Sequence, residues 1–288
     1  MKWIMSLFVV LSLSCFSNEY KIEPVKDNVY RFNAGHYYSV FMITESAAFV
    51  TDPINSDAAQ WLKAEIKRRF NVPIKYMAYS HNHIDHTQGG GFLADSTTQV
   101  IAHRYADEDL RWTDAPTRMA DITFAQELKV NMGSNSVELV YHGPNNGRGS
   151  VSMRFMPANV LYIVDWIVLG RMPYQDLQGY DIHGMIRSTE EVLAMAPFDV
   201  LVGGHADMGT RDDVKYYLSY IKALYDGVRD GMLSGLSVEE IQQQLTLSEF
   251  KSLPMFAQWR EANIAGVHRM LMDQSYFNFR PDIKSNKD

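Results

Sequence analysis

The sequence predicts an α+β protein in which two β-sheets pack face to face and helices cover their outer faces. Short apolar runs typical of strands form two groups along the 288 residues, and helix-like patterns interleave with both groups. Hydrophobic residues make up 46% of the chain, which is enough for a sizeable core. No repeat, low-complexity segment or Pro/Ser-rich linker divides the two groups, so we expect one domain over residues 18–288.

The first group of predicted strands encloses one clear helix. Residues 56–70 place Ala58, Leu62 and Ile66 on one face at a spacing of four, and Asn55 precedes them as a possible cap. The region 103–124 is expected to be helical or irregular, with a break at Pro116. The strand candidates of this group are 39–44, 47–51, 74–79 and 100–102.

The second group contains four short strand candidates separated by Gly, Asn and Pro, at 127–130, 137–141, 151–155 and 160–164. A helix over 181–195 and a strand over 200–202 follow. Further helices are expected over 210–275, where Thr210 and Ser237 can act as caps and Glu240 is in capping-box register with Ser237.

The charge balance argues against a nucleic-acid partner. The chain has 27 basic and 34 acidic side chains, a net charge of −7, and no run of Lys or Arg that could follow a phosphate backbone. We therefore expect a small-molecule substrate. The sequence carries no signal for the oligomeric state.

The amino terminus predicts a signal peptide over residues 1–17 and export, in a bacterium to the periplasm. Lys2 precedes an apolar run over residues 3–13, about half the ~20 residues that a permanent membrane helix needs, so no stable span is expected. Lipid anchoring through Cys15 is disfavoured, because Ser12 stands where a lipoprotein signal normally has leucine. Cleavage after Ser17 would leave a chain without cysteine, so any metal must be held by histidine and carboxylate.

Three histidines and an aspartate lie within six residues, directly after the apolar strand at 74–79: His81, His83, Asp85 and His86. They cannot share one face of a helix, but a turn that leaves a strand can present them to two nearby points. Imidazole and carboxylate are zinc ligands. Coordination can lower the pKa of water to about 7, which supplies a hydroxide nucleophile at neutral pH.

The segment 81–86 resembles the H-x-H-x-D-H signature of the metallo-β-lactamase superfamily. Further motifs follow in the family's order over about residues 28–206: Thr51-Asp52-Pro53, Tyr141-His142-Gly143-Pro144, Val164-Asp165 and Gly203-Gly204-His205. The resemblance implies an αββα sandwich, the fold of this family, with the metals at one edge.

The resemblance also implies a role for each matching residue. His81 and His83 would bind a first metal, and Asp165 would bridge it to a second. Asp85, His86 and His205 would bind that second metal. Asp85 could in addition act as the catalytic base, and Asp52 would support the ligand loop without touching metal.

The chain departs from the family at one ligand, because Asn146 stands where a histidine of the first site is expected. An amide oxygen is a weaker zinc donor than imidazole, so the first site should lose affinity. His142 is an alternative replacement. We expect one tight Zn²⁺, with a second, looser ion or a degenerate site as alternatives, and iron as the alternative metal.

Three residues are candidates for substrate binding: Tyr37 in an early loop with His36 and Tyr38, Trp166 after the bridging aspartate, and Arg148 in the substituted loop. Each can equally be a packing or surface residue. The function expected is a zinc-dependent hydrolase of an ester, amide, lactam or related bond. The alternatives are a metal-binding, catalytically weak relative and an iron-dependent oxidoreductase.

Overall fold

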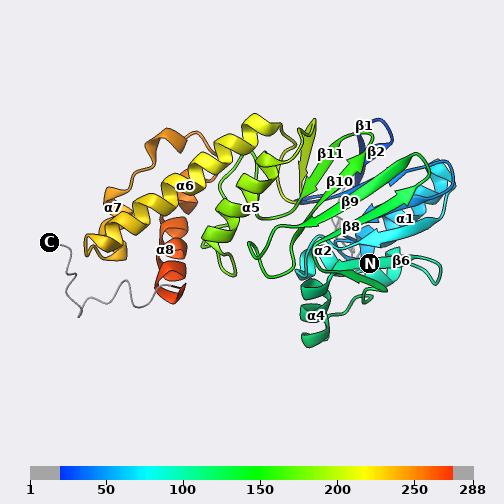
Figure 1. The fold of residues 1–288 in the computed structure, drawn as a ribbon, viewed down its shortest axis with the longest axis horizontal. Coiled ribbons are helices and arrows are strands. Elements are labelled where there is room, and N and C mark those ends of the chain that lie inside the picture. The colour runs from blue at the N-terminus through cyan, green and yellow to red at the C-terminus, as the bar shows by residue number, and fades with distance from the viewer. Residues whose placement is uncertain (1–19, 275–288) are drawn as a thin grey trace, which may run out of the picture.

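The computed structural model describes residues 20–274, which form two β-sheets between outer layers of helices (Figure 1). The predicted signal segment 1–17, with Cys15, lies outside the described residues. The first sheet has the order β1-β2-β3-β4-β5-β6-β7 and the second has the order β12-β11-β10-β9-β8. The α+β sandwich expected from the two groups of strands is confirmed, and its layers have the order αββα.

The strands of the first sheet are β1 (Lys21–Lys26), β2 (Val29–Ala34), β3 (Tyr37–Ile43), β4 (Ala48–Thr51), β5 (Ile74–Ala78), β6 (Gln99–His103) and β7 (Ile122–Phe124). Those of the second are β8 (Glu127–Met132), β9 (Asn135–Tyr141), β10 (Val151–Met156), β11 (Val160–Ile163) and β12 (Val200–Gly203). The helices are α1 (Ser56–Phe70), α2 (Ile84–Thr87), α3 (Gly90–Leu93), α4 (Arg104–Trp112), α5 (Ile182–Ala194), α6 (Arg211–Leu233), α7 (Val238–Gln244) and α8 (Phe256–Gln274), with a 3₁₀ turn at Ser248–Phe250.

The alternation of side chains along a strand accounts for the layers. In β3, Val40 and Met42 face the second sheet, and the ring of Phe49 from β4 meets that of Phe155 from β10 edge to face at 5.9 Å. Phe41 points the other way, into a second apolar cluster with Leu62 of α1. Both faces of the first sheet are therefore buried.

Helix α1 occupies the predicted residues because both of its ends are capped. The side chain of Asn55 accepts a hydrogen bond from Ala58 N, and Asn71 ends the helix in the left-handed conformation with φ of 53°. The capping box predicted at Ser237 and Glu240 is also present, at the start of α7.

The helices α5, α6 and α8 cover the outer face of the second sheet through a third apolar cluster. In Figure 1, α6 and α8 also extend away from the strands towards one end of the elongated molecule. Among residues 20–274, no helix combines the length and apolar character that crossing a membrane requires.

Candidate metal centre

The motifs identified in the sequence meet at one edge of the sandwich because they follow strands that run parallel. β4 pairs in parallel with β5, and β11 pairs in parallel with β12, so the residues after these strands emerge at one edge of each sheet. Asp52 follows β4, His81 and His83 follow β5, Asp165 follows β11 and His205 follows β12. The turn expected at 81–86 contains one helical turn, α2, which begins only after His83.

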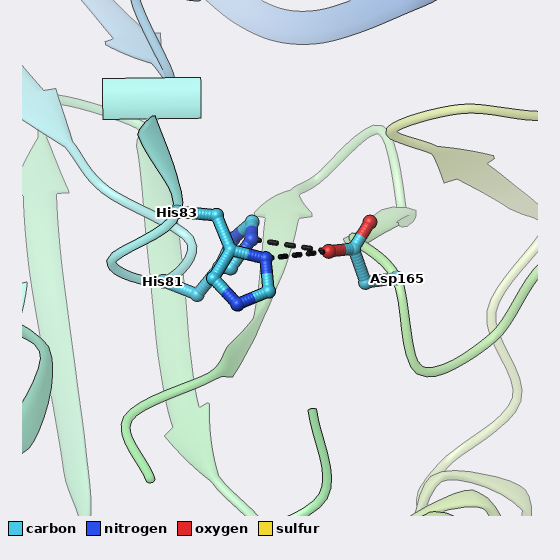
Figure 2. Close-up of side chains that lie close together, drawn as sticks. All are labelled: His81, His83 and Asp165. Atoms are coloured by element: carbon cyan, nitrogen blue, oxygen red, sulfur yellow. Dashed lines mark hydrogen bonds and ion pairs between the residues drawn. The ribbon is translucent and has the colours of Figure 1, made fainter. Parts of the chain in front are cut away.

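Among residues 20–274, two groups of three side chains could each hold a metal ion: His81, His83 and Asp165 in one, and Asp85, His86 and His205 in the other. Within each group the ligand atoms lie within 4.8 Å of one another. Figure 2 shows the first group, in which His81 Nε2 and His83 Nδ1 each lie 3.2 Å from Asp165 Oδ2.

Asp165 contacts both groups. Its Oδ1 atom lies 3.0 Å from His205 Nε2, and its Oδ2 atom faces the first group. The structure therefore brings together every histidine and aspartate that the resemblance assigns to metal, with Asp165 in the bridging position.

Buried partners orient the imidazoles of His81 and His86. The Ser80 hydroxyl donates to Asp52 Oδ2 at 2.6 Å, so it accepts from His81 Nδ1 at 2.8 Å. Asp52 Oδ2 also accepts from His86 Nδ1 at 3.2 Å. Each ring is thereby fixed with its proton on Nδ1 and its Nε2 lone pair turned to the centre, the tautomer that a metal ligand needs.

The Nε2 lone pairs of these imidazoles are placed to bind a cation. His81 Nε2 is buried and has no hydrogen-bond partner. His86 Nε2 and His205 Nε2 lie 2.9 Å apart, and His205 Nδ1 donates to the carbonyl of His36. Two bare imidazole nitrogens repel each other at this distance unless a proton or a metal ion is shared between them. The donor set is therefore that of a metal centre.

Asn146 lies at the first group, where the resemblance places it. It is fully buried, and its Nδ2 donates to Asp165 Oδ2 at 2.6 Å, while its Oδ1 has no hydrogen-bond partner. In this conformation the amide nitrogen donates to the bridging carboxylate, and the unpartnered Oδ1 is the side-chain atom left to ligate a cation. Because an amide oxygen is a weaker zinc donor than imidazole, the expectation of a weakened first site stays a prediction.

Charge keeps both buried carboxylates ionised. Burial acts to raise the pKa of Asp165, but the attraction of His81 and the close contacts with His205, His81 and His83 outweigh it, so that pKa lies well below its usual value. Burial likewise acts to raise the pKa of Asp52, and its hydrogen bond with His86 holds that pKa below normal. Both side chains are acceptors at neutral pH.

The backbone at these carboxylates is strained, as is common at functional sites. Asp52 and Asp165 have φ of 28° and 64°, in the left-handed region that favours glycine, which costs about 1–3 kcal/mol per residue. Gly204 lies close to both groups, since a Cβ there would come within 2.5 Å of Val164 Cγ1 and 3.0 Å of His86 Cε1. A side chain at this position would displace the ligand loop.

The other candidate residues have different surroundings. Tyr37 lies in β3 and not in a loop, and its ring meets that of His205 edge to face at 5.3 Å, so it borders the centre. His142 is turned away, with Nδ1 3.1 Å from Glu191 Oε2 and Nε2 2.9 Å from Ser152 Oγ, and therefore does not replace the missing ligand.

The structure gives two substrate-binding candidates other contacts. Trp166 is 1% exposed and packs against the His142 ring, so it is a core residue that substrate does not reach. Arg148 forms ion pairs with Glu108 and Asp109 of α4, at 3.0 and 2.5 Å, and its side chain is 41% exposed. The order of motifs along the sequence could not predict these contacts, because both depend on packing between distant segments.

Two contributors were not identified in the sequence. Ser80 fixes the His81 tautomer, and its position directly before the histidine motif could have identified it in the sequence. Tyr162 is fully buried in β11 and donates to Asp52 Oδ2 at 2.8 Å. The sequence offered no signal for this tyrosine, which occupies an ordinary inward position of an apolar strand.

A curated relative and two solved structures resemble this chain. The 2,4-dinitroanisole O-demethylase subunit alpha of Nocardioides sp. (strain JS1661) is 25% identical over 187 residues, which are 64% of this chain and 56% of that protein. The chain thus spans little more than half the length of that relative.

The metallo-beta-lactamase from Pontibacter korlensis matches with a TM-score of 0.64 at 15% identity, over 71% of this chain and 99% of that chain. The DIM-1 metallo-beta-lactamase matches with a TM-score of 0.62 at 19% identity, over 71% of this chain and 97% of that one. Both support the fold.

A family model described as the metallo-beta-lactamase superfamily matches residues 35–205, which include both groups of candidate metal ligands. This match spans more than half of the chain, and the strand-end motifs occupy the positions that the fold requires. The chain belongs to the metallo-beta-lactamase superfamily.

Proposed function

We propose that this chain is a zinc-dependent hydrolase that cleaves an ester, amide, lactam or related bond of a small molecule. The observation that carries this proposal is the Asp165 carboxylate between two groups of oriented imidazoles, with Oδ1 towards His205 and Oδ2 towards His81 and His83. Zinc bound there would lower the pKa of a coordinated water to about 7 and polarise the bond under attack.

The two groups differ in how well they suit a metal. Asp85, His86 and His205 form a complete set and would hold the tighter ion. His81 and His83 would hold a weaker one with Asp165, because Asn146 supplies no imidazole. Zinc accepts imidazole and carboxylate ligands in tetrahedral sites, and iron, which accepts the same donors, is the alternative metal.

Solvent-facing residues of the centre would meet the substrate. The side chains of Asp85 and His83 are 36% and 38% exposed, whereas those of His81 and His86 are at most 1% exposed. Substrate would therefore approach from the side of Asp85 and His83. There the Asp85 carboxylate, whose Oδ2 lies 3.4 Å from His205 Nε2, could accept the proton of the attacking water.

A second candidate reaction is the demethylation of an electron-poor aryl methyl ether, favoured by the name of the curated relative. Water attacking such an ether would release a phenol and methanol, with no oxidant consumed. The same centre could carry out this hydrolysis, with the aromatic ring in place of an acyl group.

The test combines metal analysis with a substrate panel. The purified chain would be assayed for bound zinc and iron, then offered an aryl ester, a β-lactam, a lactone, a phosphodiester and 2,4-dinitroanisole. We expect turnover of at least one compound, lost in His205→Ala and retained in Arg148→Gln, whose side chain is engaged by α4. Bound metal without turnover would favour a binding protein, and iron without zinc would favour an oxidoreductase.

Export is a separate proposal. The segment 1–17 has the charge and apolar length of a signal peptide. Expression in a bacterium with its own amino terminus should yield periplasmic protein that begins at Asn18. A full-length cytoplasmic product would refute it.

A further inference from the structure

Asn146 is held at three of its four polar atoms. Its backbone N–H donates to the side-chain oxygen of Asn145, and its carbonyl accepts from the Ser150 hydroxyl. Its Nδ2 donates to Asp165 Oδ2 at 2.6 Å. The fourth atom, Oδ1, is buried without a hydrogen-bond partner, as is Nε2 of His81, which lies 3.2 Å from the same Asp165 oxygen (Figure 2). Two unpartnered buried atoms beside one carboxylate oxygen are placed to share a cation.

The side chain of Asn145 connects Asn146 to helix α5. Asn145 is fully buried, and its Nδ2 donates to the hydroxyl oxygen of Ser188 in α5 at 3.1 Å. That hydroxyl in turn donates to the carbonyl of His142 at 3.0 Å. Because a backbone N–H can only donate, the Asn145 amide must present its oxygen to Asn146 and its NH₂ group to Ser188. One hydroxyl of α5 therefore fixes the orientation of the amide that accepts from Asn146.

Backbone contacts hold the loop between β9 and β10 against the same helix. Arg187 of α5 donates from Nη2 to the carbonyl of Pro144 at 2.9 Å, and the N–H of Asp181, before α5, donates to the carbonyl of Asn145 at 2.7 Å. A Cβ at Gly184 would overlap the carbonyl oxygen of Pro144, so the loop approaches α5 too closely for a side chain there. The loop that carries Asn146 is therefore mounted on α5, which lies outside both groups of candidate ligands.

We propose that Ser188 is a positioning residue of the first metal group and acts through Asn145. The hydroxyl orients the Asn145 amide, which fixes the backbone of Asn146 and leaves its Oδ1 available to the cation that His81 and His83 would bind. An amide oxygen is a weak donor, so its contribution to affinity depends on being held in place before the cation arrives. This inference rests on the metal centre of the proposed function, but cation binding does not require turnover.

The test is titration of the metal-free protein with Co²⁺, whose visible absorption changes with the ligands around the ion. We expect wild type to bind Co²⁺ in a tight phase and a weaker phase, and His81→Ala to abolish the weaker one, which assigns it to the first group. Ser188→Ala should weaken that phase about ten-fold, the lower end of the cost of losing an outer partner of a metal ligand, and alter its spectrum. The tight phase should keep its affinity and spectrum.

A double-mutant cycle tests the path through Asn145. Asn145→Ala should weaken the first-group phase at least as much as Ser188→Ala does. Adding Ser188→Ala to Asn145→Ala should cost no further affinity, because the hydroxyl would have no amide left to orient. Losses that add in the double variant would overturn the path, since each residue would then act by itself.

The matched control is Thr189→Val, because Thr189 is also fully buried in α5 and its hydroxyl donates to the carbonyl of Met185 within the same helix. It should bind Co²⁺ in both phases as wild type does. An equal loss in Thr189→Val, or an equal weakening of both phases in Ser188→Ala, would overturn the positioning role, since the hydroxyl would then serve stability alone.

Two further outcomes of the titration are decisive. A single Co²⁺ phase in wild type, or an unchanged weaker phase in Ser188→Ala, would overturn the positioning role. Two phases that respond to Ser188→Ala as expected, without turnover of any panel compound, would overturn the proposed hydrolase and leave the positioning role standing.

Discussion

Replacing Asp52 by asparagine changes one atom of the buried support beneath the metal centre. Asp52 Oδ1 accepts from Ser80 N at 2.7 Å, and Oδ2 accepts from the hydroxyls of Ser80 and Tyr162 and from His86 Nδ1. An amide can keep the first bond through its oxygen, but its NH₂ group then faces the other three donors.

The consequence falls on His86. The hydroxyls of Ser80 and Tyr162 can rotate to accept from the new amide, but the imidazole can accept at Nδ1 only by moving its proton to Nε2, the atom turned to the metal. Loss of such an orienting partner typically costs 10–100-fold in metal affinity, or about 1.4–2.7 kcal/mol. Because a buried charge-assisted contact is also broken, we expect about 3 kcal/mol less unfolding free energy in the metal-free protein.

The assay is competition for zinc against a chelating dye at pH 7, paired with urea unfolding of the metal-free proteins. Asp107→Asn is the matched control, since Asp107 is only 8% exposed and lies in α4. Its carboxylate forms an ion pair with Arg111 of the same helix and accepts a hydrogen bond from Ala120 N in the following loop. The control should lose stability and keep zinc affinity. Equal zinc affinity in Asp52→Asn and wild type, or an equal loss in both variants, would refute this account of the His86 tautomer.

Three further predictions concern packing, charge and metal. Gly204→Ala should release zinc and destabilise the chain by about 1–3 kcal/mol, because the added Cβ would press on Val164 and His86. Zinc analysis and urea unfolding measure the two effects, and full zinc occupancy in the variant would contradict the prediction. Glu65→Gln should lower the free energy of unfolding by at most about 1 kcal/mol at pH 7, because hydrogen bonds from arginines of α1 lower the pKa of Glu65 to about 2. This contribution is present above about pH 4.5 and is lost as the pH falls towards 2. Urea unfolding should therefore show a smaller difference between wild type and variant at pH 3.5 than at pH 7. Zinc at 100 times the dissociation constant should raise the free energy of unfolding of wild type by about 2.7 kcal/mol. In thermal melts, zinc should raise the melting temperature less in His205→Ala than in His81→Ala. The reverse order would contradict a tight second site.

The parts of the fold with strong local signals were predictable. Helix α1 begins and ends at the predicted residues, because spacing and both caps agree there. The strands β1 and β2 were not predicted. β1 carries Lys21, Glu23, Pro24 and Lys26 at the edge of the sheet, where a strand needs no apolar alternation to find a partner.

The metal ligands could be predicted because several of them lie within a few residues and the rest stand directly after strands. Their supporting partners could not. Tyr162 reaches Asp52 across 110 residues, and Arg148 meets α4 across 39, so only the packed structure shows which of these side chains is engaged. Trp166 shows the same limit, since its position after the bridging aspartate is compatible with both a buried and a substrate-facing ring.

We propose that Asn146 occupies a ligand position of a two-metal centre and weakens its first site. Elemental analysis of wild type beside Asn146→His, each loaded with zinc and then freed of excess, tests it directly. We predict about one ion per chain in wild type and a rise towards two in the variant, because an imidazole would complete the set with His81 and His83. An unchanged zinc content in a folded Asn146→His protein would show that residue 146 does not belong to the first site.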